Sequence, residues 1–243
     1  MGVHNRLVHT RFETSTAIVL PGTGSDAQFA QEAFGQAFDV VGLTTVAVEP
    51  DPTGVVRSYL GALDDAVRAH GPVVVAGISL GAAVAAHWAE RNRSSVVALA
   101  LALPAWTGDP TGSPAALSAR FTAGSLREHG LDSVTATMAE SSPEWLARTL
   151  ARSWASQWPA LPRALDEAAS YRGPELDRLA RIDAPTVVVG AIDDPVHPIA
   201  VAEQWARALP RGVLRTVTLT DIGLDPGVLG REAVDALTAA LDG

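Results

Sequence analysis

The sequence lacks two residue types that many enzymes use as nucleophiles or ligands. Its 243 residues include no cysteine, which excludes thiolate nucleophiles, cysteine-bound zinc, iron–sulfur clusters and disulfides. All 18 basic residues are arginine, so a Schiff base, a serine–lysine dyad and a P-loop lysine are excluded as well. The nucleophile candidates that remain are serine, threonine, tyrosine, the carboxylates and the six histidines.

Positive charge and long apolar runs are also scarce. The chain has 27 acidic residues against 18 basic ones, a formal charge of −9, which argues against nucleic acids and anionic membranes as partners. No apolar stretch reaches the length of a membrane-spanning helix, and residues 1–6 lack the features of a signal peptide. We therefore expect a cytoplasmic protein, either a monomer or a small homo-oligomer.

Apolar runs alternate with helical patterns along most of the chain. The runs that we expect to form strands are 17–20, 44–48, 72–78, 96–101, 185–189 and 213–219. Helices are expected at about 26–38, 54–70, 80–92, 199–209 and 228–241. Continuous apolar runs indicate strands covered on both faces. The alternation predicts an α/β fold with a mostly parallel sheet flanked by helices, and Arg6–Glu13 is a candidate for an extra edge strand.

The alternation stops between residues 105 and 182, where alanine-rich windows and tryptophans replace the strands. We expect a helical cap or lid over 105–182, inserted between core segments 1–104 and 183–243. Trp154 and Trp158 are four residues apart, hence on one helical face. The apolar underside of such a cap would line a pocket, which favours an apolar or aromatic ligand over a sugar phosphate. Arg148 and Arg152 have the same spacing and are expected to form a solvated face.

The most informative motif is Gly77-Ile78-Ser79-Leu80-Gly81, which follows an apolar strand and precedes an alanine-rich helix. In that context G-x-S-x-G predicts a nucleophile elbow, a tight turn that lifts the Ser79 hydroxyl above the sheet. The alternative is an ordinary serine in a glycine-bounded turn.

A glycine-rich loop, Pro21-Gly22-Thr23-Gly24-Ser25-Asp26, follows the first buried strand. Acyl transfer needs two N–H donors directed at the developing oxyanion. The backbone of Leu80 would supply one donor and Thr23 in the loop the other. A phosphate cradle is the competing interpretation, but no lysine follows and the glycine spacing does not fit a dinucleotide motif.

The stretch Asp193-Asp194-Pro195-Val196-His197-Pro198 follows the late strand. An acid at the carboxyl end of a strand can orient a catalytic imidazole, although either aspartate could instead cap a turn or the next helix. We favour Asp194 over Asp193.

Taken in chain order, these features resemble the α/β-hydrolase superfamily, and in particular its small actinobacterial-type members, in which an acid-Pro-x-His-Pro turn follows the late strand. The resemblance spans essentially the whole chain, with 105–182 in the place of the family's cap. It implies that Ser79 is the nucleophile, Asp194 the triad acid, and Leu80 and Thr23 the oxyanion-hole residues. No cofactor and no metal are implied.

The sequence departs from this family at two positions. The family's catalytic histidine follows the last strand, but Leu224 stands there and no histidine occurs after His197. Pro21 replaces the histidine of the family's oxyanion loop. Without a base, a serine hydroxyl is a poor nucleophile at neutral pH.

Several residues are candidates for the missing base. His197 is the best placed, although the matching histidine in family members coexists with a separate catalytic one, which favours a structural role. His129 could reach the site from the cap. Asp221 and Asp225 flank the vacated position, and a carboxylate pair there could titrate abnormally high, but solvated turn residues are the simpler interpretation. His87 on the elbow helix is expected to be a packing residue.

The favoured function is that of an esterase-like serine hydrolase acting on a small apolar ester or acyl substrate. One alternative is a catalytically inactive member of the fold that binds a ligand or partner. Another is a lyase, isomerase or cyclase reaction in the same pocket. The fold alone does not distinguish these possibilities.

Overall fold

A computed structural model of the protein describes residues 12 and 14–241. Its centre is a six-stranded sheet with the order β2-β1-β3-β4-β5-β6, in which every pair of neighbours is parallel. In chain order the elements are β1 (Thr16–Leu20), α1 (Ala27–Val40), β2 (Thr44–Ala47), α2 (Val55–His70), β3 (Val73–Ile78), α3 (Leu80–Arg91), the 3₁₀ helix η1 (Arg93–Ser95), β4 (Val96–Ala102), α4 (Pro114–Ser141), α5 (Glu144–Gln157), α6 (Leu161–Ser170), α7 (Leu176–Leu179), β5 (Thr186–Ala191), α8 (Ile199–Ala208), β6 (Gly212–Val217), α9 (Leu219–Leu224) and α10 (Val228–Leu241).

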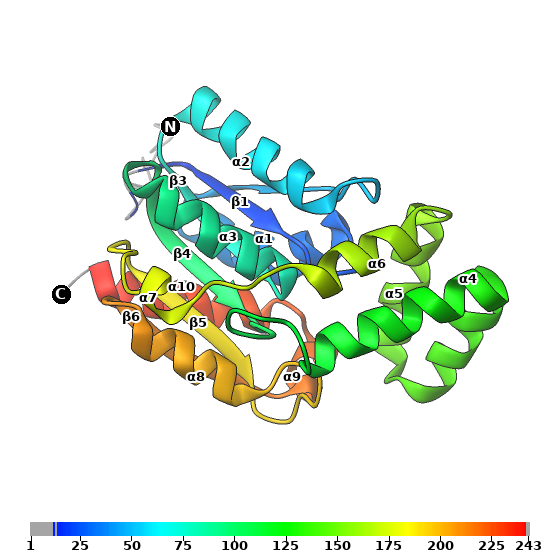
Figure 1. The fold of residues 1–243 in the computed structure, drawn as a ribbon. Coiled ribbons are helices and arrows are strands. Elements are labelled where there is room, and N and C mark those ends of the chain that lie inside the picture. Colours follow the sequence, from blue (N-terminus) through cyan, green and yellow to red (C-terminus); the bar gives the residue numbers. More distant parts are fainter. Residues whose placement is uncertain (1–11, 13, 242–243) are drawn as a thin grey trace, which may run out of the picture.

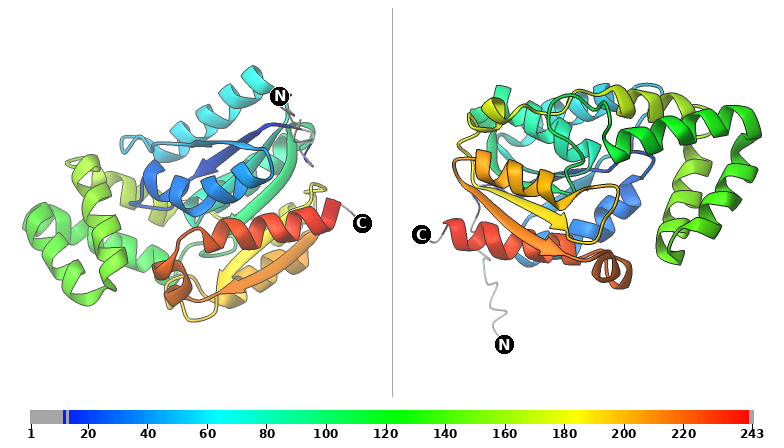
Figure 2. Two further views of the ribbon diagram at one scale, coloured as in Figure 1. Left: turned by 180° about the vertical axis from the view of Figure 1, so that it is seen from behind. Right: turned by 60° about the horizontal axis from the view of Figure 1, so that its bottom comes forward.

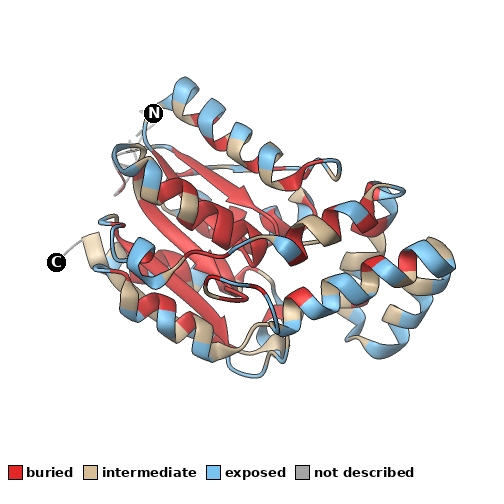
Figure 3. Ribbon diagram, in the orientation of Figure 1, coloured by how far each residue is buried: buried red, intermediate tan, exposed pale blue. Residues whose placement is uncertain are grey.

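The predicted α/β class and parallel sheet are confirmed, and the helices cover both faces of the sheet (Figures 1 and 2). Helices α1 and α10 pack against one face, and α2, α3 and α8 against the other. Every residue of β1, β3 and β5 is therefore buried (Figure 3), as their continuous apolar sequences predict. Apart from Phe12, the extra strand suggested for Arg6–Glu13 lies outside the described residues.

Short helix α9 was not expected from the sequence. Its first turn is fixed by a capping box, in which the Thr218 side chain accepts a hydrogen bond from Asp221 N and the Asp221 side chain accepts one from Thr218 N. The signal is present in the sequence as threonine followed three residues later by an acid. Strand β6, expected to continue to residue 219, therefore ends at Val217, and α9 begins at Leu219.

Between β4 and β5 the described chain forms helices α4 to α7 and no strand. Helices α4, α5 and α6 project beyond the sheet (Figure 1) and share a small apolar core of their own. Its buried residues are Ala123, Leu126, Trp154, Leu161 and Leu165. Helix α4 is interrupted at Gly130, whose φ of 76° is favourable only for glycine. Within the described chain, no helix has the length and apolar character needed to cross a membrane.

The order of the strands determines where a ligand site is expected. From β1 the chain moves to β2 on one side, and then returns to place β3 on the other side of β1. In open parallel sheets, ligands bind outside the carboxyl ends of the strands at such a reversal. The loop after β1 and the turn after β3 both lie at this point. They carry two of the three candidate segments of the sequence, the glycine-rich loop and the G-x-S-x-G motif.

Candidate active site

Ser79 lies at the sharp turn between β3 and α3, with φ 53° and ψ −112°. A positive φ is costly for a residue with a Cβ and persists only where the surroundings enforce it. Here Ser79 N donates to Ala102 O at the end of β4 (2.9 Å), while Ser79 O accepts from Ala83 N in α3 (3.1 Å). This sharp strand-to-helix turn, with the hydroxyl at the helix N-terminus, is the geometry expected of a nucleophile elbow.

The glycines of the motif are required by backbone contacts. A Cβ on Gly77 would overlap the carbonyl group of Gly81, and a Cβ on Gly81 would overlap the carbonyl oxygen of Leu20 at the end of β1. Gly22 lies against the same turn, since a Cβ there would be 3.4 Å from the Ser79 Cβ. The elbow and the loop after β1 are therefore packed together at backbone distance.

The loop after β5 brings Asp194 and His197 to Ser79. Asp194 Oδ1 accepts hydrogen bonds from Val196 N (2.7 Å) and His197 N (3.1 Å), which fold the loop back on itself. Asp194 Oδ2 is 2.7 Å from His197 Nδ1, and His197 Nε2 is 3.0 Å from Ser79 Oγ. One short loop thus supplies both the acid and the imidazole. Asp193 is directed elsewhere and accepts from Leu219 N (2.7 Å).

The environment of Asp194 keeps it ionised. Burial of its carboxyl group, whose side chain is 7% exposed, would raise the pKa. The hydrogen bond and the positive charge of His197, with the two backbone N–H donors, outweigh that effect and hold the pKa of Asp194 below 3.8. An ionised Asp194 can accept a hydrogen bond from an Nδ1–H of the His197 ring, and Nε2 of the same ring faces Ser79 Oγ at 3.0 Å.

Two backbone N–H groups in the segments around Ser79 have no hydrogen-bond acceptor among the described residues. Leu80 is the first residue of α3, so its N–H has no acceptor within the helix. Thr23 lines the cavity with Gly22 and Ser79, and its N–H makes no hydrogen bond to another described residue. The structure thus brings together the five residues that the sequence singled out, namely Ser79, Asp194, His197, Thr23 and Leu80.

A cavity of about 750 Å³ opens above these residues, between the sheet and the cap. Ser79, Asp194 and His197 lie on its wall. Helices α4 and α5 contribute much of the rest. Its aromatic lining residues are Phe29, Trp106, Phe121, Trp145 and Trp154. Trp158, expected on the same helical face as Trp154, does not line the cavity. It is the C-cap of α5, where its N–H still bonds to Trp154 O (3.0 Å), and it is 39% exposed.

The other candidates for a base are not in contact with Ser79. Leu224, at the family's usual histidine position, is 82% exposed. Asp221 belongs to the capping box of α9, and Asp225 pairs with Arg231 (2.6 Å). His129 is a cavity-lining residue on α4, but the hydrogen bond to Ser79 Oγ comes from His197.

His87 has the packing role that was expected. Its Nδ1 is 2.7 Å from the Tyr171 hydroxyl, and burial lowers the pKa of His87. Among the described residues no group of three or more His, Asp or Glu side chains is arranged to hold a metal ion.

Sequence reasoning missed the contacts between the cap and the glycine-rich loop. Arg148 is exposed and pairs with Glu144, as a solvated face predicts. Arg152 was assigned to the same face, but its guanidinium instead binds Asp26 through two hydrogen bonds. The two arginines are four residues apart and therefore share one helical face, so nothing in the sequence pattern distinguishes them.

Comparison with known proteins identifies the class. A model of the alpha/beta hydrolase family matches residues 6–226, and the chain therefore belongs to this family. No protein with a curated description is detectably similar to it in sequence.

Several solved structures have the same fold. BpoC from Mycobacterium tuberculosis H37Rv, a candidate non-heme bromoperoxidase, has a TM-score of 0.70 at 18% identity, with 94% of each chain covered. A hydrolase from Oleispira antarctica has a TM-score of 0.68 at 12% identity, covering 100% of this chain and 97% of its own. A thermophilic esterase from Thermogutta terrifontis has a TM-score of 0.63 at 17% identity, covering 93% of this chain and 88% of its own. At these identities the similarity shows the fold alone.

Proposed function

We propose that the protein is an esterase-like serine hydrolase, with Ser79 as nucleophile, His197 as general base and Asp194 as the acid that orients it. The observation that carries the proposal is the continuous chain of hydrogen bonds from Asp194 Oδ2 through the imidazole to Ser79 Oγ, 2.7 and 3.0 Å long. The sequence alone favours a structural role for His197. A hydrogen bond to the elbow serine instead favours the role of base.

In the proposed acylation step, His197 Nε2 takes the Ser79 proton while Oγ bonds to the substrate carbonyl carbon. The carbonyl electron pair moves onto oxygen, and the N–H groups of Leu80 and Thr23 stabilise that oxyanion. As the carbonyl re-forms, the bond to the leaving alkoxide breaks and His197 donates its proton to that oxygen. Water then cleaves the acyl-enzyme by the same steps. Asp194 stabilises the imidazolium throughout, and no cofactor is needed.

The lining of the cavity supports an apolar acyl or ester substrate. Trp106, Trp145 and Trp154 contribute large apolar surfaces, and the volume of about 750 Å³ lies within the range of pockets for small organic molecules. The described lining residues contain no arginine, the cation that would recognise a phosphate in a chain without lysine.

The first test is labelling of the full chain with a fluorophosphonate, followed by intact-mass measurement. We expect one adduct on the wild type and none on Ser79→Ala. Hydrolysis of p-nitrophenyl acetate, butyrate and octanoate then tests the acyl preference, with the longer chains favoured by the apolar cavity.

An unlabelled wild type after prolonged exposure, with no ester hydrolysed, would contradict the hydrolase assignment and favour the ligand-binding alternative. An adduct that persists in Ser79→Ala would assign the nucleophile to another residue. Circular dichroism of Ser79→Ala controls for loss of the fold.

A further inference from the structure

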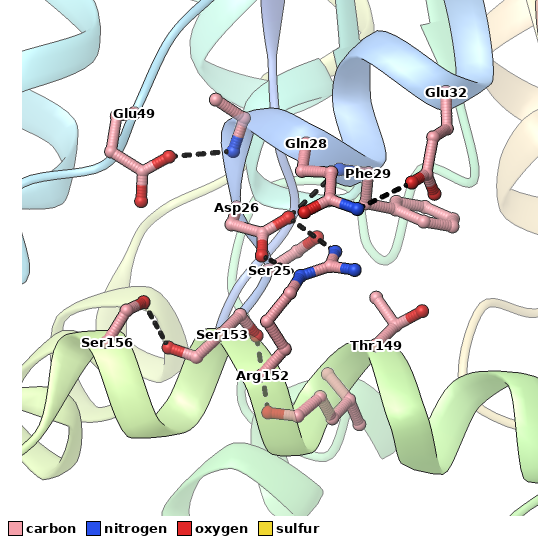
Figure 4. Close-up of polar contacts among 12 residues, drawn as sticks. Ser25, Asp26, Gln28, Phe29, Glu32, Glu49, Thr149, Arg152, Ser153 and Ser156 are labelled. Atoms are coloured by element: carbon pink, nitrogen blue, oxygen red, sulfur yellow. Dashed lines mark hydrogen bonds and ion pairs between the residues drawn. The ribbon is translucent and has the colours of Figure 1, made fainter.

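Helix α5 of the cap lies directly on the loop that follows β1, and polar side chains connect the two (Figure 4). Arg152 binds Asp26 in a two-pronged arrangement, with Nε 2.8 Å from Oδ2 and Nη2 3.0 Å from Oδ1. Such a fork fixes direction as well as distance, because two parallel hydrogen bonds hold two planar groups in register.

The helix also binds the two residues that precede Asp26. Ser153 Oγ donates to Gly24 O, and Gln157 Nε2 donates to Ser25 O at 2.8 Å. Ser153 and Gln157 are four residues apart, hence on one helical face, and both are buried. Three consecutive loop residues, 24 to 26, are thus each bound by a side chain of α5.

Asp26 joins this contact to the core of the protein. Its carboxylate also caps α1 by accepting from Phe29 N at 2.9 Å, and the residue is 6% exposed. The loop is therefore held between a core helix and a cap helix. Thr23, the proposed second oxyanion donor, directly precedes the held residues, so its N–H direction depends on where they lie.

We propose that α5 positions the oxyanion site, with Arg152, Ser153 and Gln157 fixing loop residues 24 to 26 so that the Thr23 N–H points at the substrate oxygen. The inference rests on the proposed function above. These three are positioning residues, since the contacts that define them are to the loop.

The informative variant is Arg152→Met, which keeps an unbranched apolar stem comparable to the aliphatic part of arginine and removes both hydrogen bonds to Asp26. Loss of an oxyanion donor typically costs about 10²–10³ in kcat, and a misplacement on the order of 1 Å about 10². We expect kcat for p-nitrophenyl butyrate to fall about 10- to 100-fold with KM nearly unchanged, because the oxyanion contact is made only in the transition state. Arg152→Lys should recover part of the loss, because it restores the charge without the fork.

Arg148→Met is the matched control. Arg148 lies one turn earlier on α5, pairs with Glu144 at the surface and has no contact with the loop, so its kcat should stay at the wild-type value. Gln157→Met is a second variant that removes the hydrogen bond to Ser25 O. It covers the case in which Arg152→Met fails to fold.

Two readouts separate positioning from a merely structural effect. A trifluoromethyl ketone forms a hemiketal oxyanion with the serine, so its inhibition constant should rise in proportion to the loss of kcat/KM. Partial unfolding would instead reduce the titrated number of active sites and leave the inhibition constant unchanged. Amide hydrogen exchange over residues 22–26 should be faster in Arg152→Met than in Arg148→Met.

Wild-type kcat or an unchanged inhibition constant in Arg152→Met and Gln157→Met would overturn the inference while leaving the hydrolase assignment intact. An inert, unlabelled wild type would overturn the assignment instead. In that case amide hydrogen exchange over residues 22–26 tests whether α5 holds the loop. Equal exchange rates in Arg152→Met and Arg148→Met would show that it does not.

Discussion

Replacement of His197 tests the unusual position of the proposed base. In the structure His197 Nε2 is 3.0 Å from Ser79 Oγ, and Nδ1 is 2.7 Å from Asp194 Oδ2. In His197→Gln the amide retains hydrogen-bonding capacity but does not take up the serine proton. The fold should persist, since the His197 side chain is at the cavity wall rather than in the apolar core.

The expected loss follows from the role of each contact. Removal of the base of a serine triad costs up to about 10⁶ in kcat, and general-base assistance alone is worth about 10²–10⁴. We therefore expect kcat to fall by about 10⁴–10⁶, which corresponds to about 5–8 kcal/mol of transition-state stabilisation. Asp194→Asn should cost about 10⁴, because the wrong imidazole tautomer is then favoured.

The assay is ester hydrolysis in four proteins: wild type, His197→Gln, Leu224→His and the double variant. Leu224 is 82% exposed at the end of α9, so a histidine there should neither raise activity nor rescue His197→Gln. If His197→Gln kept more than about one tenth of the activity, His197 would not be the general base, because removal of a general base costs about 10²–10⁴. Rescue by Leu224→His would likewise contradict the proposed placement of the base.

Three further predictions concern stability and are measured by urea unfolding. Gly81→Ala should lower the free energy of unfolding by about 1–3 kcal/mol, because its Cβ would overlap backbone at the end of β1. Gly61→Ala in α2, whose Cβ would meet no other atom, should raise it by up to about 1 kcal/mol. Equal changes in the two variants would contradict this prediction. Burial lowers the pKa of His87 from 6.5, so its contribution to stability is complete above pH 6.5 and declines as the pH falls toward the folded-state value. His87→Gln should reduce the change of stability with pH. If the change with pH is the same in the variant, another group causes it. Ser25→Ala should be neutral or stabilising by about 1 kcal/mol, because the buried Ser25 hydroxyl has no partner in the described structure; a clear loss would reveal one.

The elements that the sequence predicted best are those with a strong local signal. Val73–Ile78 is a continuous apolar run, and the Gly-bounded serine and alanine-rich helix after it define the elbow without reference to the rest of the chain. The parallel sheet follows from the alternation of strands and helices.

The proposed base was harder to predict, because its position depends on how a loop folds. Asp194 draws the N–H groups of Val196 and His197 onto one carboxylate oxygen, and this turn directs the imidazole toward Ser79. The sequence shows the acid and the histidine three residues apart, but not the direction of the ring. The pairing of Arg152 with Asp26 is a stronger case, because 126 residues separate them.

The placement of acid and imidazole in the loop after β5 has a mechanical consequence. When the two groups belong to different loops, either can drift and break their mutual contact. Here Asp194 holds the backbone of the segment that carries His197 as well as its ring, so displacement of the loop moves both together. The distance from His197 Nε2 to Ser79 Oγ, 3.0 Å in this structure, is therefore determined by the position of one loop relative to the elbow.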